Sequence, residues 1–144
     1  MKLVIASDHG GYLLKGALVA QLRERKDVVL EDLGTSDANS VDYPDYAHRV
    51  ATGIVEGKYD RGILVCGTGV GMAIAANRHK GIRAVNCSDT YTARLSRDHN
   101  DSNVLCIGER VVGSGLAWDI VTAWLDAPAS TNERHARRRQ KIEL

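Results

Sequence analysis

The stretch LVCGTGVGMAIAANR, residues 64–78, runs from apolar residues through a cysteine and three glycines into a helix-like segment. Its apolar start is continuous with the residues before it, which is typical of a strand buried on both faces of a parallel sheet. The glycines allow a sharp turn, and Ile74 and Ala75 then follow at helical spacing. This order of strand, glycine loop and helix is one unit of an α/β fold.

Working outward, the chain repeats this alternation of short apolar runs and longer amphipathic segments. Five strands are predicted, most of them buried on both faces: 2–7, 28–33, 61–66, 82–87 and 103–108. Apolar residues at helical spacing between them are Leu14, Leu18, Leu22, Tyr46, Val50, Ile54, Leu116, Ile120, Val121 and Trp124. Alternating strands and helices imply right-handed crossovers. The sequence therefore predicts a three-layer α/β/α fold with a five-stranded parallel sheet of flavodoxin or Rossmann type, followed by a C-terminal helix over about 130–144.

The composition narrows the class of protein. We expect a single domain over 1–144, because 144 residues suffice for one core and no repeat or long linker divides them. A net charge of +1 argues against a nucleic-acid partner. No apolar run approaches the roughly 18 residues of a membrane span. Three cysteines without a CxxC pair, and no signal-like start, indicate a cytoplasmic protein.

Polar residues gather where the predicted strands end, and in an open parallel sheet those carboxyl ends are where ligands bind. Asp8 and His9 follow the first strand, the glycine loop follows the third, and Glu109 and Arg110 follow the fifth. The free amides of the loop are suited to face an anion at the start of the next helix. The spacing GTGVG is neither GxGxxG nor a lysine-containing phosphate loop, so nucleotide binding has little support. The loop therefore predicts a site for a phosphate or an oxyanion.

The three cysteines differ in their surroundings. Cys66 directly precedes the loop amides, which would stabilise a thiolate there. The alternative is a buried structural cysteine beside a tight turn, and the residue by itself does not decide between the two. Cys87 and Cys106 lie within apolar runs, and we expect both in the core.

His99 stands between a short predicted helix and the fifth strand. A histidine there is able to transfer protons near neutral pH, although it can also simply cap a helix end. We expect His48 and His79 to be surface residues.

The last predicted helix carries a basic cluster. Arg134 and Arg138 are four residues apart and share one face, so both could hold one phosphate. A solvated helix face and a nucleic-acid patch are the alternatives, the latter disfavoured because no aromatic residues are interleaved. A helix that ends the chain is also free to reach a partner subunit.

Four segments, SDHGGYLLK (7–15), GTSDANSVDYPDYA (34–47), ILVCGTGVGMAIAANRHKGIRAV (63–85) and ARLSRDHNDSNVLCIGERVVG (93–113), resemble the type B ribose-5-phosphate isomerases. That family is shared with the galactose-6-phosphate isomerase subunits. The resemblance covers nearly the whole chain. It implies a flavodoxin-like fold and a homodimer, in some members a tetramer, with its sites at the subunit interface. It also implies reversible conversion of ribose 5-phosphate to ribulose 5-phosphate with a sugar phosphate as the only small-molecule partner and with no metal or cofactor.

The resemblance also assigns roles to residues. Cys66 matches the base that removes the C2 proton, and His99, helped by Thr68, matches the group that opens the furanose ring. Some family members use a glutamate base further along, but MAIAANR contains no acid. The remaining matches are the enediolate-binding amides of Gly67, Gly69, Val70 and Gly71, the sugar-hydroxyl contacts Asp8, Tyr43 and Asn100, and the phosphate ligands His9, Arg110, Arg134 and Arg138.

Two alternatives to this function stay open. Related chains act on six-carbon phosphates such as allose 6-phosphate or galactose 6-phosphate. A non-catalytic sugar-phosphate-binding module would keep the glycine loop but would not need Cys66 and His99 together.

Overall fold

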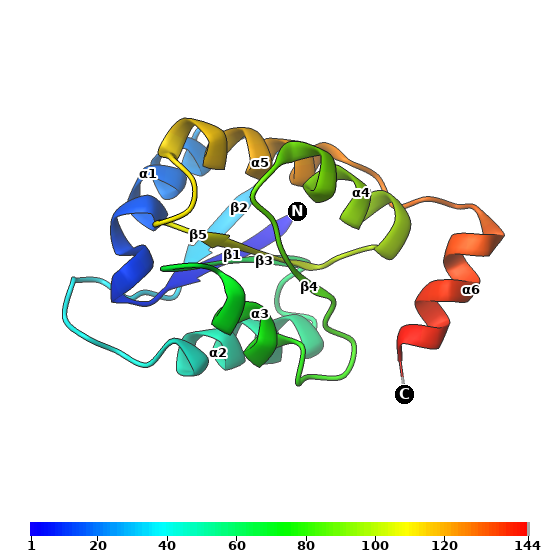
Figure 1. The fold of residues 1–144 in the computed structure, drawn as a ribbon, viewed down its shortest axis with the longest axis horizontal. Coiled ribbons are helices and arrows are strands. Elements are labelled where there is room, and N and C mark those ends of the chain that lie inside the picture. The colour runs from blue at the N-terminus through cyan, green and yellow to red at the C-terminus, as the bar shows by residue number, and fades with distance from the viewer. Residues whose placement is uncertain (144) are drawn as a thin grey trace.

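The computed structural model describes residues 1–143 and contains an all-parallel five-stranded sheet (Figure 1). Its strands are β1 (Lys2–Ser7), β2 (Val29–Asp32), β3 (Arg61–Cys66), β4 (Ala84–Asn86) and β5 (Val104–Gly108). The helices are a short η1 (His9–Gly11), then α1 (Tyr12–Arg23), α2 (Tyr43–Val55), α3 (Val70–Ala76), α4 (Thr90–Asn100), α5 (Ser114–Asp126) and α6 (Glu133–Ile142). The predicted α/β class is confirmed, while position 144 of the predicted last helix lies outside the described residues.

Helices cover both faces of the sheet. In Figure 1, α1, α4 and α5 form one layer, and α2 and α3 form the other. Because successive side chains of a strand point to opposite faces, Leu3 and Ile5 pack with the first layer, while Val4 and Ala6 pack with the second. This alternation produces the predicted three-layer arrangement, with one apolar cluster on each face.

The strand order is β2-β1-β3-β5-β4, which exchanges the last two positions of the flavodoxin order. The chain leaves β1 in one direction to form β2 and in the other to form β3. The boundary between β1 and β3 is therefore the topological switch point of this sheet. A crevice at that boundary, outside the carboxyl ends, is where ligands of open α/β sheets bind.

The prediction of continuous two-sided burial holds for the inner strands and is wrong for the edges. Central β1, β3 and β5 are almost wholly buried, but β2 is largely exposed, with Val29 at 71% exposure. β4, at the other edge, is also only partly covered. An edge strand has one unpaired side, so its apolar residues are not enclosed by neighbours.

Two of the apolar residues placed at helical spacing point outward. Ile74 is 60% exposed and Leu116 is 44% exposed, whereas Ala75 and Ile120 on the same helices face the core. The spacing thus located the helices but did not fix which of their residues pack.

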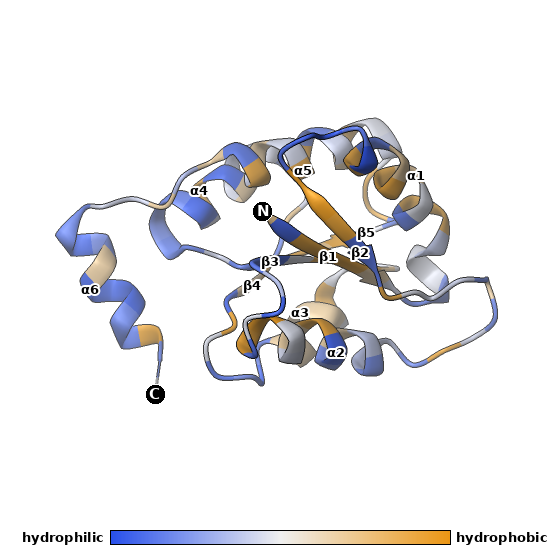
Figure 2. Ribbon diagram, turned by 180° about the vertical axis from the view of Figure 1, so that it is seen from behind, coloured by the Kyte–Doolittle hydropathy of each residue, from blue (hydrophilic) through white to orange (hydrophobic). Residues whose placement is uncertain are grey.

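Helix α6 stands apart from the rest of the chain (Figure 1). It buries none of its residues, most of which are hydrophilic (Figure 2). Asn132 caps its first turn through a bond from the Arg134 amide. Within residues 1–143, no helix has the length and apolar character needed to cross a bilayer.

Candidate active site

The carboxyl ends of β1, β3 and β5 bring three segments together. Ser7 is paired with Val65, and Cys66 is paired with Gly108, so the residues that follow these strands emerge side by side. The Arg110 amide donates to the Gly67 carbonyl at 3.0 Å, which ties the segment after β5 to the glycine loop. This cluster lies at the switch point of the sheet.

Cys66 occupies the last position of β3 and is 5% exposed. Its Sγ accepts a hydrogen bond of 3.0 Å from the Gly69 amide. Gly69 has φ +83, a left-handed conformation that costs other residues about 1–2 kcal/mol. A Cβ there would also collide with the Asn86 side chain and lie 3.1 Å from the Ile107 backbone. The loop therefore needs glycine at this position in order to direct an amide at the sulfur.

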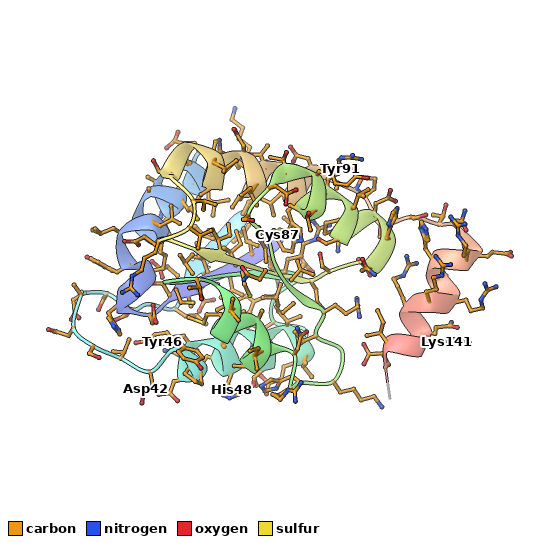
Figure 3. All side chains as sticks on the ribbon, viewed as in Figure 1. Asp42, Tyr46, His48, Cys87, Tyr91 and Lys141 are labelled. Atoms are coloured by element: carbon orange, nitrogen blue, oxygen red, sulfur yellow. The ribbon has the colours of Figure 1, made fainter. Side chains whose placement is uncertain are left out.

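The other two cysteines are core residues, as the sequence predicts. Burial raises the pKa of Cys106 well above its usual value, and its side chain is fully enclosed. Burial, and secondarily the charge of Asp89, raise the pKa of Cys87 to about 11. Figure 3 shows Cys87 between the sheet and α4. Neither thiol is ionised at neutral pH, which leaves Cys66 as the cysteine placed for chemistry.

The turn after β1 lies directly against the glycine loop. Asp8 is buried, and its Oδ1 accepts from the Gly11 amide at 3.1 Å. His9 is exposed, and its Nδ1 accepts from the Val41 amide at 3.2 Å. A Cβ added to Gly10 would lie 3.3 Å from the Gly67 nitrogen. The two segments are thus in van der Waals contact, and His9 is also joined to the 33–42 loop.

Three further predicted residues border the loop. The Tyr43 ring, at the start of α2, would lie 2.7 Å from a Cβ at Gly71. The Arg110 guanidinium would lie 3.0 Å from a Cβ at Gly67. Thr68 is exposed, and its hydroxyl accepts from the Val70 amide at 3.3 Å. Ten of the predicted residues therefore lie together at the carboxyl ends of the strands: Asp8, His9, Tyr43, Cys66, Gly67, Thr68, Gly69, Val70, Gly71 and Arg110.

His99 and Asn100 are placed elsewhere in this chain. They end α4, which precedes the first residue of β5. Between the pairs Gly62–Val104 and Cys66–Gly108 the strands advance four residues, or about 13 Å. His99 therefore lies at the amino ends of the strands, whereas the Cys66 thiol lies at their carboxyl ends.

Arg134 and Arg138 also lie away from the glycine loop, on α6 beside the end of α4 (Figure 1). The His135 ring contacts the His99 ring, with centroids 4.3 Å apart. Burial, and then the charge of His99, lower the pKa of His135. Within a single chain the predicted site residues thus fall into two separate groups, one around Cys66 and one around His99 and the two arginines.

Two hollows of the surface border these residues. The hollow beside Thr68, Val70 and Gly108 measures 170 Å³, below the roughly 300 Å³ at which small-molecule pockets begin. A larger hollow of 550 Å³ is lined mostly by residues between 77 and 85, His79 among them, and by Asn100 and the end of α6. The described part of the chain, 1–143, contains no group of three or more side chains able to hold a metal ion.

Sequence reasoning gave no role to Glu109, although it follows the fifth strand. Its Oε2 accepts a 2.8 Å hydrogen bond from the Leu14 amide in the first turn of α1. Gly11, at the N-cap of that helix, has no side chain to do this. Glu109 therefore caps α1 from a position 95 residues away, and the only sequence signal is its place beside Arg110.

Comparison with known proteins places this geometry in a family. The model of the family described as Ribose/Galactose Isomerase matches residues 3–142. Ribose-5-phosphate isomerase B of Escherichia coli is 51% identical over 98% of this chain and 93% of its own. D-erythrulose-4-phosphate isomerase of Pectobacterium atrosepticum is 40% identical over 88% of this chain and 84% of its own. The solved structure of Clostridium thermocellum ribose-5-phosphate isomerase B superposes with a TM-score of 0.95, at 51% identity, covering 99% of this chain and 95% of the other. The resemblance in the sequence is thereby confirmed: the chain belongs to the ribose/galactose isomerase family.

Proposed function

We propose that this chain is a ribose-5-phosphate isomerase of type B, which interconverts ribose 5-phosphate and ribulose 5-phosphate through a cis-enediolate. The observation that carries the proposal is the Cys66 sulfur, held 3.0 Å from the Gly69 amide at the switch point of the sheet. Family membership supports an aldose–ketose isomerase, and two relatives at 51% identity are named for this pentose.

Cys66 is the base of the proposed reaction. Its thiolate takes the proton from C2 of the open-chain sugar and returns it to C1, so that C2 is oxidised while C1 is reduced. Negative charge develops on oxygen in between, and the amides of Gly67, Gly69, Val70 and Gly71 stabilise it. No external oxidant or reductant is consumed.

His99 opens the furanose ring with the help of Thr68, and it does so from a second copy of the chain. The proposal is a homodimer, because Cys66 and His99 lie at opposite edges of the sheet within one copy. In the assembled site, His9 and Arg110 of one copy and the two α6 arginines of the other hold the phosphate. Their binding energy positions C2 over the thiolate. Asp8, Tyr43 and Asn100 contact the sugar hydroxyls.

The proposal treats 1–144 as one isomerase domain that works in the cytoplasm, in the pentose phosphate pathway, without a cofactor. It leaves a substrate choice to measure, because one relative is named for a four-carbon sugar phosphate. The six-carbon sugar phosphates allose 6-phosphate and galactose 6-phosphate are the other candidate substrates.

The test is a kinetic assay of ribose 5-phosphate, allose 6-phosphate and erythrulose 4-phosphate with no added metal. We expect the pentose to give the highest kcat/KM. Cys66→Ala should lower kcat at least about a hundredfold, the usual share of a general base, while sugar-phosphate binding survives. Cys87→Ala is the matched control and should keep turnover, because the Cys87 side chain packs in the apolar cluster on the opposite face of the sheet from Cys66, and its pKa is raised to about 11.

Each other outcome changes the proposal in a defined way. Faster turnover of the hexose or tetrulose phosphate would keep the mechanism and replace the substrate. Undiminished turnover by Cys66→Ala would remove the thiol from the role of base. Binding without turnover of any of the three sugars would favour a sugar-phosphate-binding module.

A further inference from the structure

Two histidines outside the candidate active site lie in contact on the α2–α3 layer. His48 belongs to the second turn of α2, and His79 follows the end of α3. Nδ1 of His48 and Nε2 of His79 are 2.8 Å apart, and the ring centroids are 5.0 Å apart with the planes inclined by 55°. Two side chains 31 residues apart in sequence thus bring one ring nitrogen each within hydrogen-bond distance of the other.

The 2.8 Å separation fits a hydrogen bond between the rings, and it also fits a pair of metal ligands. Two imidazole nitrogens, each about 2.0 Å from an ion, are about 2.8 Å apart at a right angle and about 3.3 Å apart in a tetrahedron. A right angle is the arrangement found in tetragonal Cu²⁺ and Ni²⁺ sites. Holding such an ion would keep the separation of the nitrogens and turn each ring by about 45°, because hydrogen-bonded nitrogens point at each other and the ion lies to the side of the line between them.

Protonation and access also favour a metal ligand pair. A metal ion binds the neutral imidazole, and a hydrogen bond between the two ring nitrogens requires that one of them carries no proton. His48 is exposed and His79 is half-buried, and Figure 3 shows His48 on the outer side of α2. A hydrated ion can reach both nitrogens from solvent.

The surroundings limit the strength of binding. Arg78 and Lys80 flank His79 in the chain, and their positive charge opposes a cation. Asp45 is one helical turn before His48, but within residues 1–143 no third ligating side chain completes a metal group. Water must fill the remaining coordination positions. Only ions near the top of the affinity order for nitrogen ligands, Cu²⁺ and Ni²⁺, overcome these costs.

We propose that His48 and His79 form a surface site for a late first-row divalent ion, Ni²⁺ or Cu²⁺, distinct from the residues gathered around Cys66. The ion bridges α2 to the end of α3, and its two protein ligands come from elements that already pack on each other. The site does not depend on the identity of the sugar substrate.

The experiment titrates Ni²⁺ into the metal-free full-length protein and follows binding by calorimetry. Nickel is the probe because copper also oxidises thiols, and Cys66 is a free cysteine. We expect one saturable equivalent. His48→Gln and His79→Gln should each weaken binding by at least about tenfold, since each removes a direct ligand. His135→Gln removes a histidine of the other aromatic pair and should leave the affinity unchanged.

Circular dichroism of the metal-free variants establishes that they fold, as expected for substitutions at accessible positions. The parent protein supplies an independent readout, because substoichiometric Ni²⁺, which is paramagnetic when water completes its coordination, should broaden amide NMR signals around residues 48 and 79 first. The proposal is overturned if no saturable Ni²⁺ binding occurs, if both single variants bind as tightly as the parent, or if Ni²⁺ broadens other regions first.

Discussion

At the scale of single residues, Glu109 shows how the sheet and the site are held together. Its backbone amide donates to the Cys66 carbonyl at 2.9 Å, while its carboxylate accepts from the Leu14 amide at 2.8 Å. One residue thereby ties the position of the thiol-bearing strand to the first turn of α1. That turn directly follows Asp8 and His9, so Glu109 is a positioning residue for three groups of the site.

Replacing Glu109 by alanine should affect both stability and turnover. The loss of a charged acceptor at a helix start should cost about 1–2 kcal/mol of unfolding free energy. Because the Cys66 and His9 segments are then free to shift, kcat/KM should fall about ten- to a hundredfold. Urea unfolding and steady-state kinetics check the two effects.

The conservative variant Glu109→Gln keeps an oxygen acceptor for the Leu14 amide and should recover most of both losses. Recovery of stability without recovery of turnover would instead indicate that the carboxylate charge acts on the substrate. Unchanged stability in Glu109→Ala would contradict the capping role.

At the scale of secondary-structure elements, α1 and its N-cap offer two glycine positions with opposite expectations. A Cβ at Gly11, the N-cap, would lie 2.5 Å from the Val65 carbonyl group, so that the start of α1 must move away from β3. At Gly16, in the middle of the helix, nothing lies within 4 Å of an added Cβ. Gly11 therefore lies against the sheet, whereas Gly16 lies on the solvent-facing side of the same helix.

Gly11→Ala should destabilise the protein by about 1–3 kcal/mol through overpacking and should also lower turnover, because Asp8 and His9 move with the helix start. Gly16→Ala should stabilise it by about 0.5–1 kcal/mol through helix propensity and leave kinetics unchanged. Thermal or urea unfolding of the matched pair measures both signs. A neutral Gly11→Ala would show that the contact with β3 relaxes without cost.

The same elements show what the sequence could and could not predict. Continuous apolar runs located β1, β3 and β5, since two covered faces demand such residues. Similar apolar runs mark β4 and β5, so the runs did not reveal that β5 lies between β3 and β4, with β4 at the edge of the sheet. The glycine loop was visible as a local pattern, because its residues are adjacent. The bond from Leu14 to Glu109 was not, because it joins residues that only the folded sheet brings together.

At the scale of the whole molecule, the separation of Cys66 and His99 decides how many chains a site needs. The resemblance predicted both residues, but it did not show that they lie at opposite ends of the strands. That placement follows from the fold, because α4 ends with His99 and Asn100 just before β5 begins, whereas Cys66 is paired with the last residue of β5. In the proposed dimer, each site takes Cys66 from one copy and His99 from the other. Two-fold symmetry then creates two equivalent sites.

Mixing two inactive variants should therefore restore activity. If Cys66→Ala and His99→Ala chains reassort at random, about half the dimers are mixed, and one of the two sites in each is intact. We expect about a quarter of the parent's turnover per chain, measured after denaturing and refolding an equimolar mixture.

A second mixture serves as its control. Cys66 and Arg110 come from the same edge of one chain, so mixing Cys66→Ala with Arg110→Ala leaves every site defective and should restore nothing. If the first mixture stays as inactive as its components, the active site does not draw His99 from a second copy.

The bond from Val41 to His9 has a further consequence for tautomers. Because Nδ1 accepts that bond, a neutral His9 must carry its single proton on Nε2. Its free nitrogen is then a donor with no lone pair to offer, which suits the oxygens of an anion. A second proton on Nδ1 would turn the acceptor into a donor facing another donor, and the 33–42 loop would lose this attachment. In the proposed site, the Nε2–H of His9 and the Arg110 guanidinium thus both donate to the phosphate.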